Sequence, residues 1–164
     1  MLDTEFSQGL LQEMKRRHLE PQWVTLEITE RESVLAHALG RQRLTQLATA
    51  GFRLSVDDFG TGYSSFELVG AMPFDELKID MALIKRITDP KGCRIVQAIV
   101  EMAKTLGLGI VAEGVETETA STLLEEMGAQ KLQGYFFSKP LQAEAFLSYI
   151  KAQAERQSQS RRAA

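Results

Sequence analysis

Four carboxylates in the sequence have the residue type and the setting to bind a divalent cation. Each lies within or at the end of a short segment of the kind that forms a β-strand: Glu27, Asp57, Asp58 and Glu113. Such a cluster is electrostatically costly unless cations neutralise it, and Mg²⁺ and Mn²⁺ favour carboxylate and water oxygens. If the four side chains converge, two bound ions could activate a water and stabilise the leaving oxygen of a phosphodiester.

Two further polar residues occupy comparable positions. Lys78 would lie beside the nucleophilic water or the phosphate and stabilise negative charge there. Gln133 could orient a water or a ligand through hydrogen bonds. We therefore include both as candidate catalytic residues, together with Glu113.

Each of these signals also has an ordinary structural explanation. The acidic pair before FGTG could merely cap a turn, and Lys78 could form a cross-strand ion pair with Asp80. Gly60 and Gly62 more often supply backbone freedom than a phosphate cradle. Glu116 is better explained as a helix cap or a loop brace. The agreement of several positions, rather than any single one, favours a functional site.

Alternating strand and helix patterns must position these residues. We expect strands at residues 24–30, 52–58, 76–80, 109–115 and 131–137. We expect helices at 5–17, 33–50, 81–87, 92–106 and 117–127, and a terminal helix after Pro140. Strand followed by helix, five times over, predicts parallel strands joined by crossovers.

Side-chain alternation within the strands places the candidates on one face. Successive residues of a strand point to opposite sides, so aliphatic residues share one face. The other face carries Glu27, Asp57, Lys78, Glu113 and Gln133. A doubly wound sheet is covered by helices on both faces and is apolar on both, whereas a barrel has a separate interior with a functional mouth. The pattern favours an α/β barrel.

The strand count suggests that the barrel is incomplete. A (β/α)₈ TIM barrel has eight strands, and only five are expected in these 164 residues. We therefore expect a TIM-barrel-like domain over residues 1–150 that lacks its N-terminal strands, followed by a polar tail at 151–164. A phosphoacceptor receiver domain also has five βα units and a Lys-Pro such as Lys139–Pro140. Its acidic pair belongs on the first strand, however, whereas Asp57 and Asp58 lie on the second.

Composition limits the location and the partners of the chain. Its net charge of −3 does not suggest a non-specific nucleic-acid surface, and no apolar run approaches the roughly 20 residues of a membrane span. The single cysteine, Cys93, can form no internal disulfide. We therefore expect a cytoplasmic protein that neither binds DNA nor inserts into a membrane.

Five separated motifs resemble, in order, those of the EAL-domain family of cyclic di-GMP phosphodiesterases. They are LEITE at 26–30, DDFGTGYSS at 57–65, LKID at 77–80, AEGVET at 112–117 and QGYFFSKPL at 133–141. The resemblance implies a (β/α)₈ barrel that hydrolyses cyclic di-GMP to linear pGpG with two Mg²⁺ or Mn²⁺ ions.

The matching motifs also imply residue roles. Glu27, Asp57 and Asp58 resemble metal ligands, Lys78 the lysine of the catalytic centre, and Glu113 a metal-site or water-activating carboxylate. Gln133 resembles a glutamine that supports this site, and Glu116 a structural glutamate. Glu30 resembles the glutamate that braces the DDFG loop and, in the family, couples metal binding to dimerisation.

Two departures from the family pattern bear on activity. The Glu-Ala-Leu and Asn-Leu-Ser motifs, whose Glu and Asn also bind metal in the family, do not occur in the sequence, and Met81 stands where an arginine is common. We therefore expect the chain alone to be weakly active or inactive. We also expect its open strand edges to pair with another copy or with the missing N-terminal segment. The alternative is a non-catalytic cyclic di-GMP-binding or regulatory EAL module.

Overall fold

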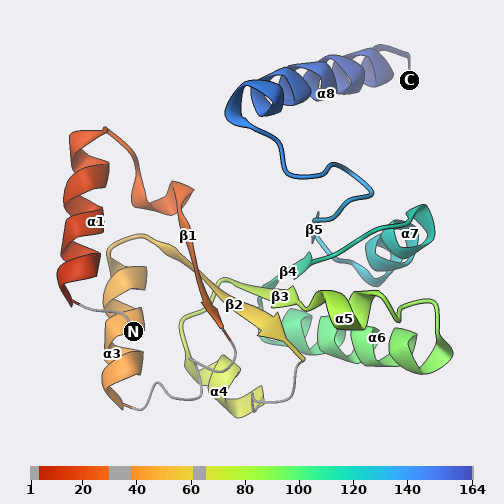
Figure 1. Cartoon of the computed structure of the whole chain (residues 1–164). Helices are drawn as coiled ribbons and strands as arrows, with labels where there is room; N and C mark the ends of the chain where they lie inside the picture. The colour runs from red at the N-terminus through yellow and green to blue at the C-terminus, as the bar shows by residue number, and fades with distance from the viewer. Residues whose placement is uncertain (1–3, 30–37, 61–65, 164) are drawn as a thin grey trace.

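Five parallel strands form one sheet at the centre of the protein (Figure 1). The computed structural model describes residues 4–29, 38–60 and 66–163. Its strands are β1 (Thr25–Thr29), β2 (Arg53–Phe59), β3 (Glu76–Ile79), β4 (Gly109–Ala112) and β5 (Lys131–Leu132). They lie in sequence order, as in a barrel wall, and not in the 2-1-3-4-5 order of a receiver domain. The TIM-barrel-like α/β class is confirmed, with an unclosed sheet in the described residues.

Helices alternate with the strands along the chain. They are α1 (Thr4–Arg16), the 3-10 helix η1 (Pro21–Trp23), α3 (Ala38–Thr49), α4 (Phe66–Ala71), α5 (Met81–Ile84), α6 (Pro90–Thr105), α7 (Glu118–Met127) and α8 (Ala143–Ala163). Figure 1 shows α5, α6 and α7 beside β3 and β4, and α8 set apart from the sheet. Helix α8 runs across residue 150, where the sequence suggested a domain boundary.

The core lies between the sheet and the helices, on the face that the alternation pattern assigns to aliphatic residues. Leu54, Val56, Leu77 and Ile79 are completely buried, while α3 contacts β2, and α6 contacts β3 and β4. The helix termini agree with local sequence chemistry. For example, Asp89 caps α6 by accepting a hydrogen bond from the backbone N–H of Gly92. Because the aliphatic strand residues pack against the helices, the polar residues that alternate with them face away from these helices.

The last strand is shorter than the sequence pattern predicted. Strand β5 ends at Leu132, and a turn follows in which the N–H of Phe137 donates to the carbonyl of Gly134. In this turn Gly134 lies so close to the backbone of Val115 that no space is left for a side chain at position 134. The predicted strand over 131–137 was therefore wrong beyond Leu132, and Gln133 lies just past the strand end.

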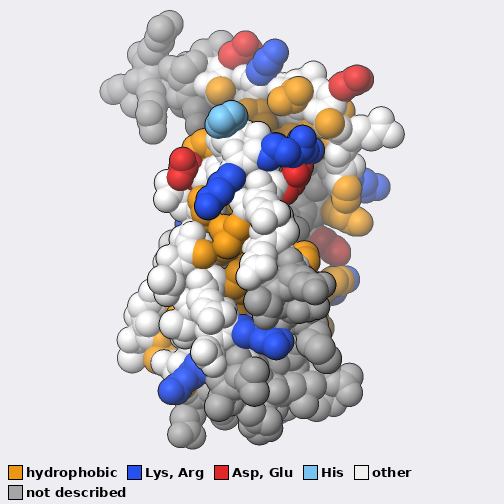
Figure 2. All heavy atoms as spheres, turned by 90° about the vertical axis from the view of Figure 1, so that its left-hand side faces the viewer, with side chains coloured by type: hydrophobic (Ala, Val, Ile, Leu, Met, Phe, Trp, Pro, Cys, Tyr) orange, Lys and Arg blue, Asp and Glu red, His pale blue; other side chains and the backbone are white. Residues whose placement is uncertain are grey.

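The face that carries α1 and α3 shows little segregation by charge (Figure 2). On the face that carries α1 and α3, basic, acidic and apolar side chains are interspersed among the described residues (Figure 2). None of the helices in the described residues has the length and hydropathy that crossing a membrane requires.

Candidate active site

The ammonium group of Lys78 lies among three carboxylates from three other strands or strand ends. Its Nζ atom is 2.9 Å from Glu27 Oε1, 2.9 Å from Asp57 Oδ1 and 2.8 Å from Glu113 Oε1. Glu27 belongs to β1, Asp57 to β2 and Lys78 to β3, and Glu113 directly follows β4. Parallel strands end at a common rim, so residues far apart in the chain meet there. Four of the five residues that the alternation pattern placed on one strand face therefore lie together.

Lys78 is positively charged in this setting. Its side chain is only 7% exposed. Burial pulls the pKa of Lys78 down, but the hydrogen bonds to Glu113, Glu27 and Asp57 outweigh burial and hold it above the usual value. Lys78 is therefore a cation at neutral pH and cannot accept a proton as a general base.

A bulge in β2 explains how two consecutive acidic residues reach the same site. Val56 of β2 pairs with Leu77 of β3, and Phe59 pairs with Ile79. Strand β2 therefore contains one residue more than β3 between these two pairs. Asp58 has a φ of 55°, in the left-handed region that Asp tolerates better than most residues. Its N–H donates a 3.0 Å hydrogen bond to Asp57 Oδ1. The extra residue re-aims the second carboxylate, which would point to the opposite face in a regular strand.

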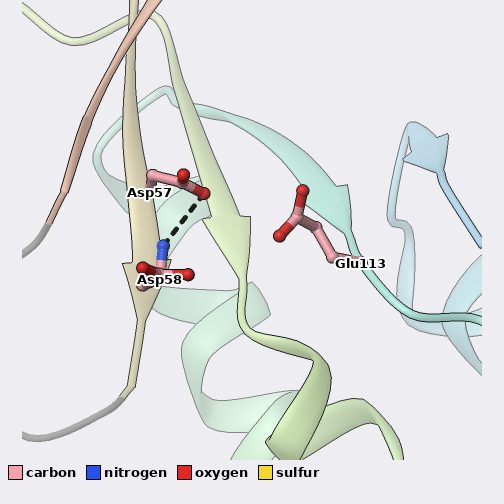
Figure 3. Close-up of side chains that lie close together, drawn as sticks. All are labelled: Asp57, Asp58 and Glu113. Carbon is pink, nitrogen blue, oxygen red and sulfur yellow. Dashed lines mark hydrogen bonds between the residues drawn. The ribbon is translucent and has the colours of Figure 1, made fainter.

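Asp57, Asp58 and Glu113 form a group with the geometry of a divalent-cation site. Each offers one carboxylate oxygen, and these three atoms lie within 4.8 Å of one another. Metal–oxygen distances of about 2.0–2.6 Å allow two ligands of one ion to be at most about 5 Å apart. Figure 3 shows Glu113 pointing from the end of β4 toward the two aspartates. The residues present therefore fit a hard divalent cation; Glu27 is outside this three-carboxylate group.

Two further predicted site residues have surroundings of their own. Gln133 is exposed and lines a separate hollow of about 370 Å³ together with residues of the following loop, among them Tyr135 and Lys139. Glu116 pairs with Lys85 at 3.4 Å on the surface. Glu30 and Gly62 lie outside the described residues.

Two glycines allow close packing next to the site. Gly60 has a φ of 103°, and a Cβ there would collide with the side chain of Leu83. Gly114 follows Glu113 with a φ of 69°, and a Cβ there would be 2.5 Å from the Cβ of Met81. Sequence reasoning missed the role of Gly114, although a glycine directly after a strand carboxylate is a signal for close backbone approach. Gly114 keeps α5 close to the end of β4.

Asp80 has a different partner from the one considered in the sequence. Its carboxylate accepts a 2.7 Å hydrogen bond from the N–H of Ala82 and caps α5. The ion pairs of Lys78 are instead made with Glu27, Asp57 and Glu113. The cross-strand pair of Lys78 with Asp80 is thus not the arrangement found.

Comparison with known proteins supplies an independent assignment. A sequence model described as the EAL domain matches residues 1–140. The cyclic di-GMP phosphodiesterase RocR of Pseudomonas aeruginosa is 37% identical over 133 residues, which is 80% of this chain and 34% of that protein. The chain therefore spans about a third of the length of RocR.

Solved structures agree in sequence and in fold. The PaMucR phosphodiesterase, in complex with c-di-GMP, is 41% identical with a TM-score of 0.77, over 81% of this chain and 54% of that one. BlrP1 of Klebsiella pneumoniae, in complex with manganese and cyclic di-GMP, is 33% identical with a TM-score of 0.78, over 84% of this chain and 36% of that one. With a family match over residues 1–140 and these structural neighbours, the chain belongs to the EAL domain family.

Proposed function

We propose that the rim formed by β1, β2, β3 and β4 is the divalent-cation site of a phosphodiesterase that hydrolyses cyclic di-GMP to linear pGpG. The observation that carries the proposal is the convergence of Asp57, Asp58 and Glu113 within 4.8 Å beside the Lys78 ammonium. The substrate is supported by two relatives, the cyclic di-GMP phosphodiesterase RocR and the PaMucR phosphodiesterase in complex with c-di-GMP. The chain spans only part of these proteins, so the substrate and the activity are proposals for this chain.

The proposed roles follow from charge and position. Asp57, Asp58 and Glu113 would hold the cation, with Glu27 beside them. Bound Mg²⁺ or Mn²⁺, two in a complete site, would polarise a phosphodiester oxygen and make water a better nucleophile. Glu113 would also orient that water, and Lys78 would stabilise negative charge on the phosphate. Gln133, just past β5, would position the ligand or a water by hydrogen bonding.

The supporting residues have simpler proposed roles. Glu116 would have the structural role in the loop after β4 that the family resemblance implies, and its exposed pair with Lys85 would add little to that role. Gly60 would let the loop after β2 pass close to α5. Glu30 would brace the DDFG loop, as the family resemblance implies, and Gly62 would supply backbone freedom in that loop. The single cysteine, Cys93, suits a reducing compartment, so we place this activity in the cytoplasm.

The open sheet bears on the activity of the chain by itself. In the described residues β1 and β5 each have a strand neighbour on one side only. Water at an unclosed interior weakens the electrostatic stabilisation of charge, so turnover by this chain alone should be slow. Unpaired strand edges also favour pairing with a second copy or with another segment of the protein.

Product analysis under single-turnover conditions tests the proposal. The chain is held in excess over cyclic di-GMP with Mn²⁺, and products are separated by chromatography. We expect slow formation of pGpG that stops with a chelator and in Asp58→Asn, and that persists in Lys85→Met, a control for loss of one positive charge. Ligand binding without any product would instead support the non-catalytic binding module. Neither binding nor product would overturn both functions.

A further inference from the structure

All three hydrogen-bond donors of the Lys78 ammonium are matched by carboxylate acceptors. A lysine side chain has three N–H donors and no acceptor. Glu27, Asp57 and Glu113 each have one oxygen within 2.9 Å of Nζ. In this arrangement Lys78 has no N–H donor left for a phosphate oxygen. The proposed function nevertheless requires Lys78 to stabilise negative charge on the phosphate.

Two of these acceptors also belong to the three-carboxylate group. Asp57 and Glu113 contact Lys78 and are also members of the group whose oxygens lie within 4.8 Å of one another. Asp58 belongs to that group alone, and Glu27 contacts Lys78 from outside it. The lysine and a divalent cation therefore share two carboxylates, and each also has one carboxylate of its own.

The two positive groups repel one another when they share these carboxylates. An ion about 2.1 Å from Asp57 Oδ1 would lie at most about 5 Å from Nζ, because Oδ1 is itself 2.9 Å from Nζ. Charges of +2 and +1 at such a distance repel one another, and the Lys78 side chain, which is only 7% exposed, is poorly screened by water. Occupation by both, with all present hydrogen bonds of Lys78 retained, is therefore unfavourable.

We propose that Lys78 is the built-in counter-cation of this site and that a divalent cation displaces it from Asp57 and Glu113. Glu27 then remains the partner of Lys78, and the two released N–H donors become free to bind an anionic phosphodiester. Cation binding thus precedes and prepares ligand binding. The inference rests on the proposed metal site, but it concerns the lysine and the order of binding.

The competition is measured by titrating the chain with Mn²⁺ alone in a calorimeter. Lys78→Met removes the charge and keeps a side chain of similar length, so we expect Mn²⁺ to bind on the order of tenfold more tightly. Lys78→Arg retains a positive charge and should bind Mn²⁺ as wild type does. Lys85→Met, which removes a lysine from an exposed pair with Glu116, should leave the affinity unchanged.

The outcomes separate this inference from the proposed function. Equal or weaker Mn²⁺ binding by Lys78→Met, with wild type binding normally, would overturn the competition and leave the metal site standing. A wild-type chain that does not bind Mn²⁺ would overturn both. Should Lys78→Met fail to fold, side-chain NMR of ¹⁵N-labelled lysine in wild type decides. The Lys78 ammonium signal should shift on addition of Mg²⁺, and an unchanged signal would contradict displacement.

Discussion

The backbone N–H of Asp58 donates a 3.0 Å hydrogen bond to the Oδ1 atom of Asp57, so the two acidic neighbours are linked inside the bulge of β2. The same Oδ1 atom accepts from Lys78, at 2.9 Å. One carboxylate thereby fixes both the backbone of the bulge and the position of the lysine. The local conformation of a single residue, Asp58, decides whether two carboxylates or one reach the site.

Substitution of Asp58 should separate its backbone role from its charge. Asn tolerates the left-handed conformation, whereas the same conformation destabilises Ala by about 1 kcal/mol. In the absence of metal we therefore expect Asp58→Ala to be about 1 kcal/mol less stable than Asp58→Asn in urea denaturation. Both variants should lose Mn²⁺ affinity. Equal stabilities would show that the positive φ at Asp58 carries no strain in solution.

The ion pair of Lys131 with Glu76 should contribute to stability away from the site. Lys131 Nζ lies 2.6 Å from Glu76 Oε2, and it joins the first residues of β5 and β3 across β4. The Glu76 side chain is only 6% exposed, so Lys131→Met leaves a buried carboxylate without its cation. We expect a loss of about 2 kcal/mol in the free energy of unfolding, below the range for fully buried pairs because Lys131 is half-exposed.

The control for that measurement is the surface pair of Lys85 with Glu116. Both of its side chains are about half exposed, and their charged atoms are 3.4 Å apart. Lys85→Met should therefore cost less than about 0.5 kcal/mol. Equal losses for the Lys131 and Lys85 variants would contradict a special role for the buried Glu76.

Gly134 should be far less tolerant of a side chain than Gly107. A Cβ at Gly134 would collide with backbone atoms of Val115, whereas a Cβ at Gly107 meets nothing within 4 Å. Gly134→Ala must push the chain after β5 away from β4, and we expect a loss of about 3 kcal/mol. Gly107→Ala should cost only about 1 kcal/mol, for its φ of 73°. Thermal unfolding measures both, and similar melting temperatures would contradict the close approach at Gly134.

The stabilising effect of Lys78 should persist at alkaline pH. Its pKa in the folded chain is above the value of about 10.4 in an unfolded chain, so its contribution is complete below about pH 10. That contribution is lost only as the pH rises through the folded-state pKa. Without metal, we expect Lys78→Met to be roughly 2 kcal/mol less stable than wild type, equally at pH 7 and pH 9. A difference that disappears between pH 7 and pH 9 would show that Lys78 loses its proton there.

The sequence predicted which strand residues share the face of the site, but not the local backbone conformation at Asp58 or after β5. Period-two alternation identified Glu27, Asp57, Lys78 and Glu113 as one face, because burial of the opposite face leaves a strand no other register. The bulge at Asp58 depends on one residue's φ, which the strand pattern does not encode. The close approach of Gly134 to Val115 was also hidden, because these residues are distant in sequence and become neighbours only in the folded chain.

The sequence pattern also could not predict which charged residues form ion pairs. Lys78 and Asp80 were plausible partners by spacing, yet Asp80 caps α5 and Lys78 reaches across to β1, β2 and the end of β4. The pair of Glu76 with Lys131 spans 55 residues of sequence. Long side chains choose among several charged neighbours according to three-dimensional distance, so spacing alone cannot rank those neighbours.

Calorimetric titration of the chain with cyclic di-GMP, in Mn²⁺ and in a chelator, tests most directly whether this rim is a cation-dependent ligand site. We predict saturable binding in Mn²⁺ that is at least about tenfold weaker in the chelator, because the carboxylates then repel the phosphates and occupy Lys78. Asp58→Asn should lose the Mn²⁺ enhancement, and Lys85→Met should keep it. Equal affinity with and without Mn²⁺, or no binding in either condition, would contradict a cation-dependent ligand site at this rim.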